Sequence, residues 1–358
     1  MNSLLFSEYK LGRINLKNRL VMAPMTRSRA INNIPNDLMA EYYKQRAGAG
    51  LLITEGTSPS PNGLGYSRIP GLFNDEQVRG WKKVTDAVHN EGGRIFVQLM
   101  HTGRVAHPLN LPANAKVLAP SAIGLKGEIW TDQKQLQPYP LPQEMTIDDI
   151  RKTIEEYTNS AKLAIAAGFD GVELHGANGY LIEQFINPTA NQRTDLYGGS
   201  PENRIRFALE VAQKIVNAIG ADRVGIRVSP YGASNGMLEY DDIDGTYALL
   251  AEKLSKLNLV YMHIVDHSSM GAPLVPPSVK ALIRKNFNGT VILAGGYDLE
   301  KAERDLQDKK GDLIAMGRFF ISNPNLVDKF KKHAVLTKAD QNTFYTPGEK
   351  GYTDYSLN

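Results

Sequence analysis

The chain has 358 residues, 42% of them hydrophobic, which is enough to bury a large core in one barrel-sized domain or in two ordinary domains. Its 41 Lys and Arg against 38 Asp and Glu give a net charge of +3, and no basic stripe is interleaved with aromatic residues, which argues against a nucleic-acid-binding protein. Cysteine is absent, which excludes disulfides, thiolate nucleophiles and iron–sulfur clusters.

Eight short apolar runs, separated by helix-like segments, predict a parallel sheet that is covered on both faces. The runs are Leu20–Pro24, Gly50–Gly56, Arg94–Met100, Phe169–Leu174, Val224–Pro230, Val260–Val265, Val291–Gly296 and Leu313–Arg318. Both the number of runs and the chain length fit an α/β fold closed as a single (β/α)₈ TIM barrel. An open, doubly wound sheet is less favoured, because no G-x-G-x-x-G follows the first run.

Two segments depart from this alternation, although we expect residues 1–358 to form one domain. Residues 104–144 are rich in Pro, Asn and Gly and are too long for an ordinary βα connection. We expect them to form a hairpin-bearing excursion after the third strand, capping the carboxyl-end face of the barrel. Residues 342–358 form a tail with four aromatic residues, which either folds across the same face or packs as an aromatic strap.

The segment His175–Tyr180, directly after the fourth strand, carries the strongest indication of chemistry. In barrel enzymes, catalytic residues lie at the carboxyl ends of the strands. If a short helical turn begins here, His175 and Asn178 share a face and can both reach one oxygen atom. Two hydrogen-bond donors beside the Tyr180 phenol suggest a site that polarises a carbonyl or nitro group and then supplies a proton. The alternative is a structural histidine at the end of a strand.

Glycines after the last two strands point to a phosphate. Gly295 and Gly296 follow the seventh strand, and Gly317 and Arg318 follow the eighth. Barrels commonly hold a phosphate at these loops through free backbone N–H groups and a nearby helix start. Arg318 can add a charge-assisted hydrogen bond.

Two further side chains suggest a flavin. Arg227 lies in an apolar strand and is costly to bury without an anionic partner, which is either a flavin that becomes anionic on reduction or a core carboxylate such as Glu173. Gln98 can both donate and accept, which suits the uracil-like edge of an isoalloxazine, although it could equally close a core network. The other candidate site residues at strand ends are Pro24, Thr26, Glu55, Gly56 and His101.

Other motifs are weak or missing. His263 and His267 are four apart in a strand-like segment, too distant for one metal, and no third ligand is evident, so we expect no metal site. There is no H-E-x-x-H, P-loop or G-x-S-x-G. The sequence shows no signal peptide and no apolar run long enough to cross a bilayer, so we expect a soluble, cytoplasmic protein without membrane partners.

Several segments resemble the Old Yellow Enzyme family of FMN-dependent ene-reductases, over essentially the whole chain. They are Met22–Arg27, Gln98–Arg104, His175–Arg204 and Gly351–Tyr355. The resemblance is greatest to the bacterial N-ethylmaleimide and pentaerythritol tetranitrate reductase group. It implies a barrel with non-covalently bound FMN, reduced by NADPH or NADH, in a monomer or homodimer.

The resemblance also implies site residues. Those that bind FMN would be Pro24, Thr26, Gly56, Gln98, Arg227, Gly295, Gly296, Gly317 and Arg318, with Thr26 on the flavin C4 carbonyl oxygen. His175 and Asn178 would bind the electron-withdrawing oxygen of the substrate, and Tyr180 would protonate the carbon next to it. Tyr66, Met100 and Tyr345 would line the substrate pocket, which would be roomier than in relatives that carry Trp at the position of Met100.

The implied activity is NAD(P)H-dependent reduction of the activated C=C bond in α,β-unsaturated carbonyl, maleimide or nitro compounds, including xenobiotics. Another FMN barrel, such as a hydroxy-acid oxidase or an amine dehydrogenase, would need a base near the flavin rather than two neutral donors. A flavin-free lyase or isomerase acting on sugar phosphates would keep the phosphate glycines. It would usually need a Lys or carboxylate at a strand end, and no such Lys is evident.

Overall fold

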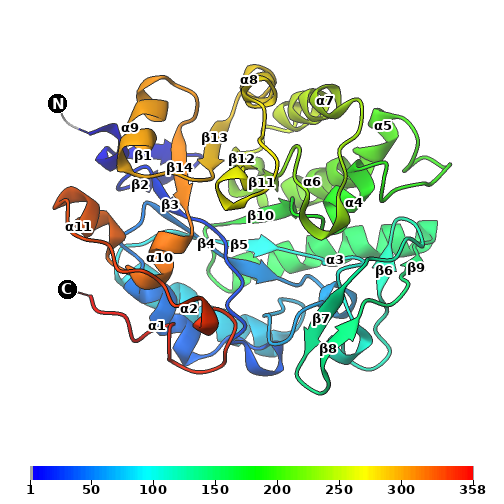
Figure 1. Ribbon diagram of the computed structural model, residues 1–358, viewed down its shortest axis with the longest axis horizontal. Coiled ribbons are helices and arrows are strands. Elements are labelled where there is room, and N and C mark those ends of the chain that lie inside the picture. Colours follow the sequence, from blue (N-terminus) through cyan, green and yellow to red (C-terminus); the bar gives the residue numbers. More distant parts are fainter. Residues whose placement is uncertain (1–2, 358) are drawn as a thin grey trace.

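Eight short, fully buried strands close into a parallel barrel in the computed structural model, which describes residues 3–357 (Figure 1). The strands are β3 (Leu20–Met22), β4 (Leu51–Thr57), β5 (Ile95–Leu99), β10 (Gly171–Gly176), β11 (Val224–Val228), β12 (Tyr261–Val265), β13 (Thr290–Ala294) and β14 (Leu313–Met316). Each pairs in parallel with the next, and β14 pairs with β3. The predicted (β/α)₈ barrel is therefore confirmed.

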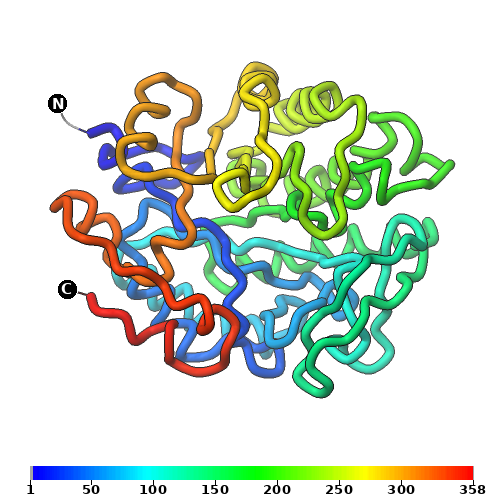
Figure 2. Tube along the Cα trace, viewed as in Figure 1, coloured from blue at the N-terminus to red at the C-terminus, as the bar shows by residue number. Residues whose placement is uncertain are grey.

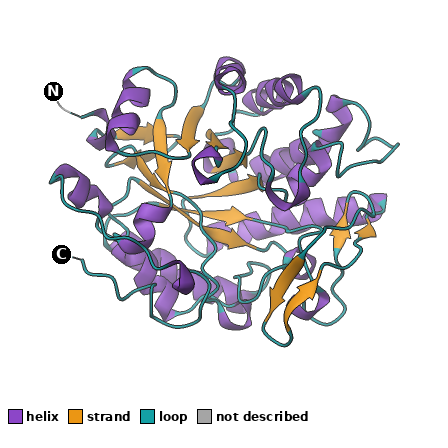
Figure 3. Ribbon diagram, in the orientation of Figure 1, coloured by secondary structure: helices purple, strands orange, loops and turns teal. Residues whose placement is uncertain are grey.

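Helices surround the strands, as Figure 3 shows. They are α1 (Asp37–Gln45), α2 (Asp75–Asn90), α3 (Ile147–Ala166), α4 (Leu181–Ile186), α5 (Pro201–Arg204), α6 (Arg206–Ile219), α7 (Ile243–Lys256), α8 (Pro277–Asn286), α9 (Leu299–Gln307), α10 (Arg318–Ser322) and α11 (Leu326–Lys331). The start of α3 is fixed by a capping box, in which Thr146 and Asp149 each accept the other's backbone N–H. None of the helices within residues 3–357 has the length and apolar character needed to cross a membrane.

An N-terminal hairpin packs against the interior of the barrel. Its strands, β1 (Tyr9–Leu11) and β2 (Ile14–Leu16), pair antiparallel, and Leu11 and Leu16 join the buried cluster that contains Leu51 and Phe96 from the barrel strands. Both leucines come ahead of β3, so the hairpin lies near the amino ends of the strands. The polar residues discussed below lie at the carboxyl ends.

The excursion at residues 104–144 contains the expected hairpin, formed by β7 (Glu128–Thr131) and β8 (Gln135–Pro138). A second, parallel pair joins β6 (Leu118–Ala119) to β9 (Gln143–Glu144) and returns the chain to α3. In Figure 1 the β7–β8 hairpin projects beside the barrel, and residues of β7 line the cavity described below.

The C-terminal tail is anchored by stacking and by arginines. The Tyr352 ring is stacked on Tyr42 of α1, with centroids 4.0 Å apart and planes 4° from parallel. Buried guanidinium groups donate to carbonyl groups of the tail: Arg27 to Gly351 (2.7 Å) and Arg29 to Phe344 (2.7 Å). The tail consequently runs past α1 (Figure 2). Both alternatives for this segment are thus realised, because Tyr352 forms a strap while residues farther upstream reach the carboxyl-end face.

Truncating the anchor should loosen the tail. Tyr352 is fully buried, so Tyr352→Ala leaves an aromatic-sized cavity, and we expect it to lower the free energy of unfolding by about 3–5 kcal/mol. Leu357→Ala, at a side chain that is 53% exposed, is the matched control and should change it by less than about 0.5 kcal/mol. Urea unfolding of both variants measures the difference, and equal losses would show that the stack does not hold the tail.

Candidate active site

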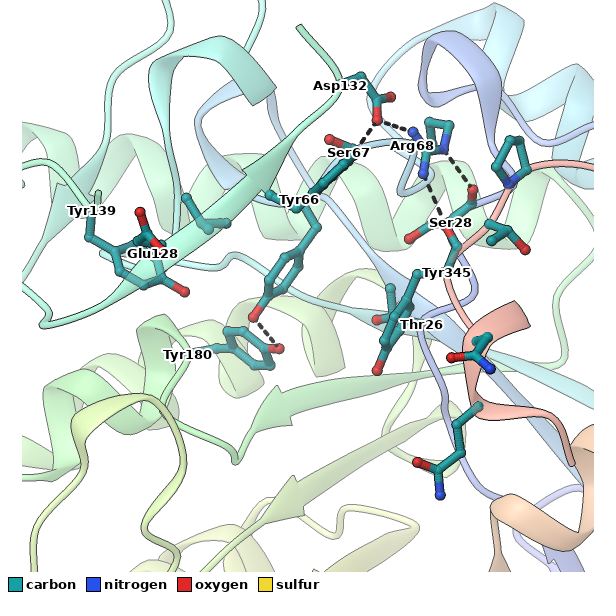
Figure 4. A pocket seen from close by; sticks show the side chains of 16 residues that line it. Thr26, Ser28, Tyr66, Ser67, Arg68, Glu128, Asp132, Tyr139, Tyr180 and Tyr345 are labelled. Atoms are coloured by element: carbon teal, nitrogen blue, oxygen red, sulfur yellow. Dashed lines mark hydrogen bonds and ion pairs between the residues drawn. The ribbon is translucent and has the colours of Figure 1, made fainter. Parts of the chain in front are cut away.

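A cavity of about 670 Å³ opens at the carboxyl-end face of the barrel (Figure 4). Its walls come from the loops after β3, β4 and β10, from the β7–β8 hairpin and from the C-terminal tail. Thr26, Tyr66, Tyr180 and Tyr345 are among its lining residues. Four of the residues predicted for the site therefore meet in one space.

Arg68 ties three of these walls together. Its guanidinium group forms an ion pair with Asp132, in the turn of the β7–β8 hairpin, and donates to the carbonyl oxygens of Tyr345 (3.0 Å) and Ser28 (3.1 Å). These bonds converge at the upper right of Figure 4. This role of Arg68 has no signal in the sequence, because its three partners lie far from it in the chain and in irregular segments.

The turn after β10 is not helical, so the condition under which His175 and Asn178 would share a helical face is not met. The strand continues to Gly176, and α4 begins only at Leu181, with Tyr180 at its N-cap position. Between them Asn178 (φ 59°) and Gly179 (φ 75°) adopt left-handed conformations. These reverse the chain between strand and helix without a helical face, and Asn and Gly are the residues that tolerate such angles best.

His175 is buried and neutral. Its Nδ1 accepts the backbone N–H of Ala177 (3.3 Å), so the ring proton lies on Nε2. Burial lowers the pKa of His175 well below its usual range, and the positive charge of Arg227 lowers it further. At neutral pH the imidazole is therefore an uncharged donor through Nε2–H.

Tyr180 stands beside both His175 and Tyr66. Its ring lies edge-on to the His175 ring, with centroids 4.8 Å apart. Its hydroxyl is 3.0 Å from that of Tyr66, as the dashed line between the two tyrosines in Figure 4 marks. Burial raises the pKa of Tyr180 to about 12, while the hydrogen bond with Tyr66 lowers it in part. The phenol is thus protonated at neutral pH and able to donate a proton.

A buried carboxylate that sequence reasoning missed lies behind the turn. Glu183 of α4 accepts from the N–H of Gly179 (2.5 Å), the hydroxyl of Ser229 (2.7 Å) and the hydroxyl of Tyr247 (3.2 Å). Ser229 Oγ in turn accepts the N–H of Asn178 (2.8 Å). Glu183 therefore fixes both left-handed residues, and the only sequence signal was an acidic residue within an apolar helix.

Gln98 and Arg227 lie on strands adjacent to β10. Gln98 Nε2 donates to Glu173 Oε1 (2.8 Å), and the other oxygen of Glu173 lies 2.8 Å from His263 Nδ1. Gln98 is thus part of a core network, as one of the two alternatives expected. The bond to Glu173 uses only Nε2, so Gln98 Oε1 can still accept a hydrogen bond. Arg227 pairs in register with His175, but it forms no ion pair within residues 3–357, and its buried Nε has no partner there. Burial lowers the pKa of Arg227, and the charge of Glu173 offsets part of this lowering without a direct contact.

The glycine loops after β13 and β14 are open at the same face. Gly295 (φ 130°) and Gly296 (φ 59°) follow β13, and Gly296 is exposed. Gly317 precedes α10, whose first N–H groups have no partner within the helix. The exposed Arg318 begins this helix. The predicted phosphate-binding groups are therefore grouped at the ends of two neighbouring strands.

Other candidate residues have different surroundings. Glu55 is buried beneath the tail, where it accepts from the N–H of Arg27 (3.3 Å) and the hydroxyl of Tyr43 (3.4 Å), and burial raises its pKa to about 7. His101 Nδ1 accepts the N–H of Gly103 (3.1 Å). Met100 is buried in a small apolar cluster against which Tyr66 and Tyr180 pack, and it is not one of the cavity-lining residues.

Gly56 and Pro24 are both buried. A Cβ atom at Gly56 would collide with the Met100 sulfur, so a larger residue here would force the Met100 side chain to move. His263 and His267, weighed above as metal ligands, are bonded to Glu173 and Asn178 respectively.

Comparisons with known proteins agree with this geometry. The profile of the NADH:flavin oxidoreductase / NADH oxidase family matches residues 4–337. The chain is 41% identical to 12-oxophytodienoate reductase 7 of Oryza sativa subsp. japonica, over 98% of this chain and 94% of that protein. It is 40% identical to a probable flavin mononucleotide-dependent alkene reductase of Leishmania infantum, over 95% of this chain and 93% of the relative. The solved structure of morphinone reductase in complex with tetrahydroNAD superposes with a TM-score of 0.94 at 40% identity, covering 99% and 98% of the two chains.

Fold, site and similarities together define an FMN-dependent oxidoreductase that uses a nicotinamide as reductant and acts on alkenes. Within this class the chain belongs to the Old Yellow Enzyme family, which confirms the resemblance seen in the sequence. The residues present fit FMN. The buried Arg227 Nε lacks a partner among the described residues, the Gln98 bond to Glu173 uses only the Nε2 donor, and none of the glycines after β13 and β14 that were predicted to bind the phosphate is buried.

Glu183 should make stability depend on pH. Burial raises its folded-state pKa to about 7 from a usual 4.5, so its contribution is fully present below about pH 4.5 and is lost as pH rises through 7. Relative to Glu183→Gln, we expect the wild type to lose about 2 kcal/mol of unfolding free energy between pH 5 and pH 8. Urea unfolding at both values measures this, with the exposed Glu155→Gln as control. A difference that is the same at both pH values would contradict it.

Proposed function

We propose that this protein is an NADPH-dependent ene-reductase that reduces the activated C=C bond of α,β-unsaturated carbonyl, maleimide or nitro compounds. The observation that carries the proposal is the pairing, at the end of one strand, of a neutral imidazole N–H donor with a protonated phenol that lines the cavity. FMN, when bound, would take a hydride from the nicotinamide and deliver it from N5 to the β carbon of the alkene.

The residues proposed to hold FMN are those at the carboxyl ends of the strands. Arg227 would bind the pyrimidine edge and supply positive charge, Gln98 would accept a hydrogen bond there, and Thr26 would donate to the C4 carbonyl oxygen. Pro24 and Gly56 would line the ring, and Gly295, Gly296, Gly317 and Arg318 would bind the phosphate.

His175 and Asn178 are proposed to bind the electron-withdrawing oxygen of the substrate. Hydride addition to the β carbon places negative charge on this oxygen, so donors that are already fixed in place stabilise the transition state more than the substrate. The neutral state of His175 suits this role, because Nε2–H donates without a change of charge. Tyr66, Met100 and Tyr345 are proposed to shape the substrate pocket, Met100 as part of the apolar cluster against which Tyr66 and Tyr180 pack.

Tyr180 is proposed to give its proton to the α carbon. As the proton leaves, a phenolate forms in a buried position, where it would be costly without a donor. Tyr66, 3.0 Å away, can supply that donor. The two tyrosines therefore form a proton-donating pair, with Tyr66 stabilising the product of the transfer.

A colour test examines the proposed function directly. The purified protein is expected to be yellow, to bleach with NADPH in the absence of oxygen, and to regain its colour when cyclohexenone or N-ethylmaleimide is added. Comparing NADH with NADPH in the same assay gives the nicotinamide preference. A reduced protein that neither substrate reoxidises would contradict the proposal.

Removing the proton donor should separate two substrate types. We expect Tyr180→Phe to slow reduction of cyclohexenone by about 10²-fold or more, because its enolate must be protonated in the site. Reduction of a nitroalkene should slow far less, since its nitronate is stable enough to leave and be protonated in water. Steady-state kinetics with both substrates measures the ratio, and equal slowing would remove Tyr180 as the proton donor.

Removing the buried guanidinium should weaken FMN binding. Arg227→Met keeps the length of the side chain but removes a charge-assisted hydrogen bond, which is worth about 1.5–3 kcal/mol, so FMN affinity should fall by about 10-fold or more. Arg13→Met is the matched control, because Arg13 is about half exposed and pairs with Asp222 near the N-terminal hairpin. Titration of the apoprotein with FMN, followed by flavin fluorescence, measures both, and unchanged affinity in Arg227→Met would exclude the assigned contact.

A further inference from the structure

Groups from three other segments hold Asn178. Its N–H donates to Ser229 Oγ (2.8 Å), its backbone carbonyl accepts from Asn235 Nδ2 (2.8 Å), and its side-chain Oδ1 lies 2.9 Å from His267 Nε2. None of the hydrogen bonds described for residues 3–357 uses Asn178 Nδ2. The amide N–H₂ is therefore the polar group of Asn178 left for a ligand.

The partner of the carboxamide, His267, is itself held by its loop. It follows β12, and its carbonyl accepts the N–H of Met270 (2.8 Å). The neighbouring Asp266 pairs with Lys280 of α8 (2.6 Å) and accepts the N–H of Ser268 (2.9 Å). A Cβ atom at Gly295 would collide with the carbonyl of Asp266, so this loop packs directly on the end of β13. His267 thus forms a fixed point facing the turn after β10.

The direction of this hydrogen bond determines what Asn178 offers a substrate. A carboxamide has an acceptor on one side and a donor on the other, and half a turn about its last bond exchanges the two. A neighbour that donates holds Oδ1 toward itself and turns Nδ2 away. Burial, with the charge of Arg227, lowers the pKa of His267 to about 4, so the ring is neutral at pH 7 and has one N–H and one lone pair.

We propose that His267 is a positioning residue, which carries its proton on Nε2, donates to Asn178 Oδ1, and so directs the Asn178 N–H₂ toward the substrate oxygen. The inference rests on the proposed function, in which Asn178 is one of two donors to that oxygen. With the amide reversed, Oδ1 would face an oxygen that becomes negative during the reaction, and a stabilising contact would become a repulsive one.

Two substitutions at one position test the direction of the bond. In His267→Glu, assayed at pH 8, the new carboxylate can only accept, so it would bond Nδ2 and reverse the amide. We expect kcat/KM for cyclohexenone to fall by about 10²–10³-fold, as in Asn178→Ala, with the loss mainly in kcat. His267→Gln can donate an N–H in a similar place and should rescue the activity to within about threefold of the wild type. Melting temperatures of the holoenzymes check that both variants fold.

A double-mutant cycle separates orientation of the amide from any general effect of the new charge. If His267 acts through Asn178, adding His267→Glu to Asn178→Ala should cause less than about a threefold further loss. A further loss of 10-fold or more would overturn the inference, as would a His267→Glu enzyme as active as the wild type. A wild type that does not reduce cyclohexenone, or an Asn178→Ala enzyme of full activity, would instead overturn the proposed function, and this inference with it.

Discussion

One buried carboxylate holds together the segment on which the site depends. Glu183 binds the N–H of Gly179 directly and the N–H of Asn178 through Ser229, so two left-handed residues in succession are stabilised from behind. Without Glu183 the turn would still contain two residues in strained, left-handed conformations, but it would lose the hydrogen bonds that stabilise them. The spacing between the imidazole of His175 and the phenol of Tyr180 follows from this turn, because one residue ends the strand and the other caps the helix.

Glu173 and Arg227, two buried charged residues on neighbouring strands of the barrel, differ in their partners. Glu173 accepts from Gln98 and lies against His263 at mid-strand, while Arg227 has no direct ion pair within the described residues. Burial is the main reason that His175 and His267 are uncharged, and the nearby Arg227 guanidinium lowers the pKa of both further. The same guanidinium favours an anionic cofactor. The guanidinium of Arg227 thus adds to the effect of burial on both histidines.

Much of the fold could be predicted from the sequence, because parallel strands that are buried on both faces appear as near-continuous apolar runs. Each such strand can be identified from its own residues, without knowing which strand it pairs with. The eight runs lie where the eight barrel strands form, and His175 stands at a strand end as expected. The turn after it is not helical, and spacing alone cannot distinguish a helical turn from two residues with positive φ. Most of the supporting contacts could not be predicted, since His267 is 89 residues from Asn178 and Arg68 is 277 residues from Tyr345. Loop residues have no periodicity that would reveal such partners.

The tail that carries Tyr345 is held mainly through its backbone, so many of its side chains can be substituted without breaking these contacts. Arg27, Arg29 and Arg46 bind carbonyl oxygens, which every amino acid possesses, and of the tail's aromatic residues Tyr352 is the one buried against α1. Substitutions at Tyr345 and its neighbours can therefore reshape one wall of the cavity while the segment keeps its course. Along this stretch of the chain, substitutions can therefore change which substrates fit the cavity without preventing the protein from folding.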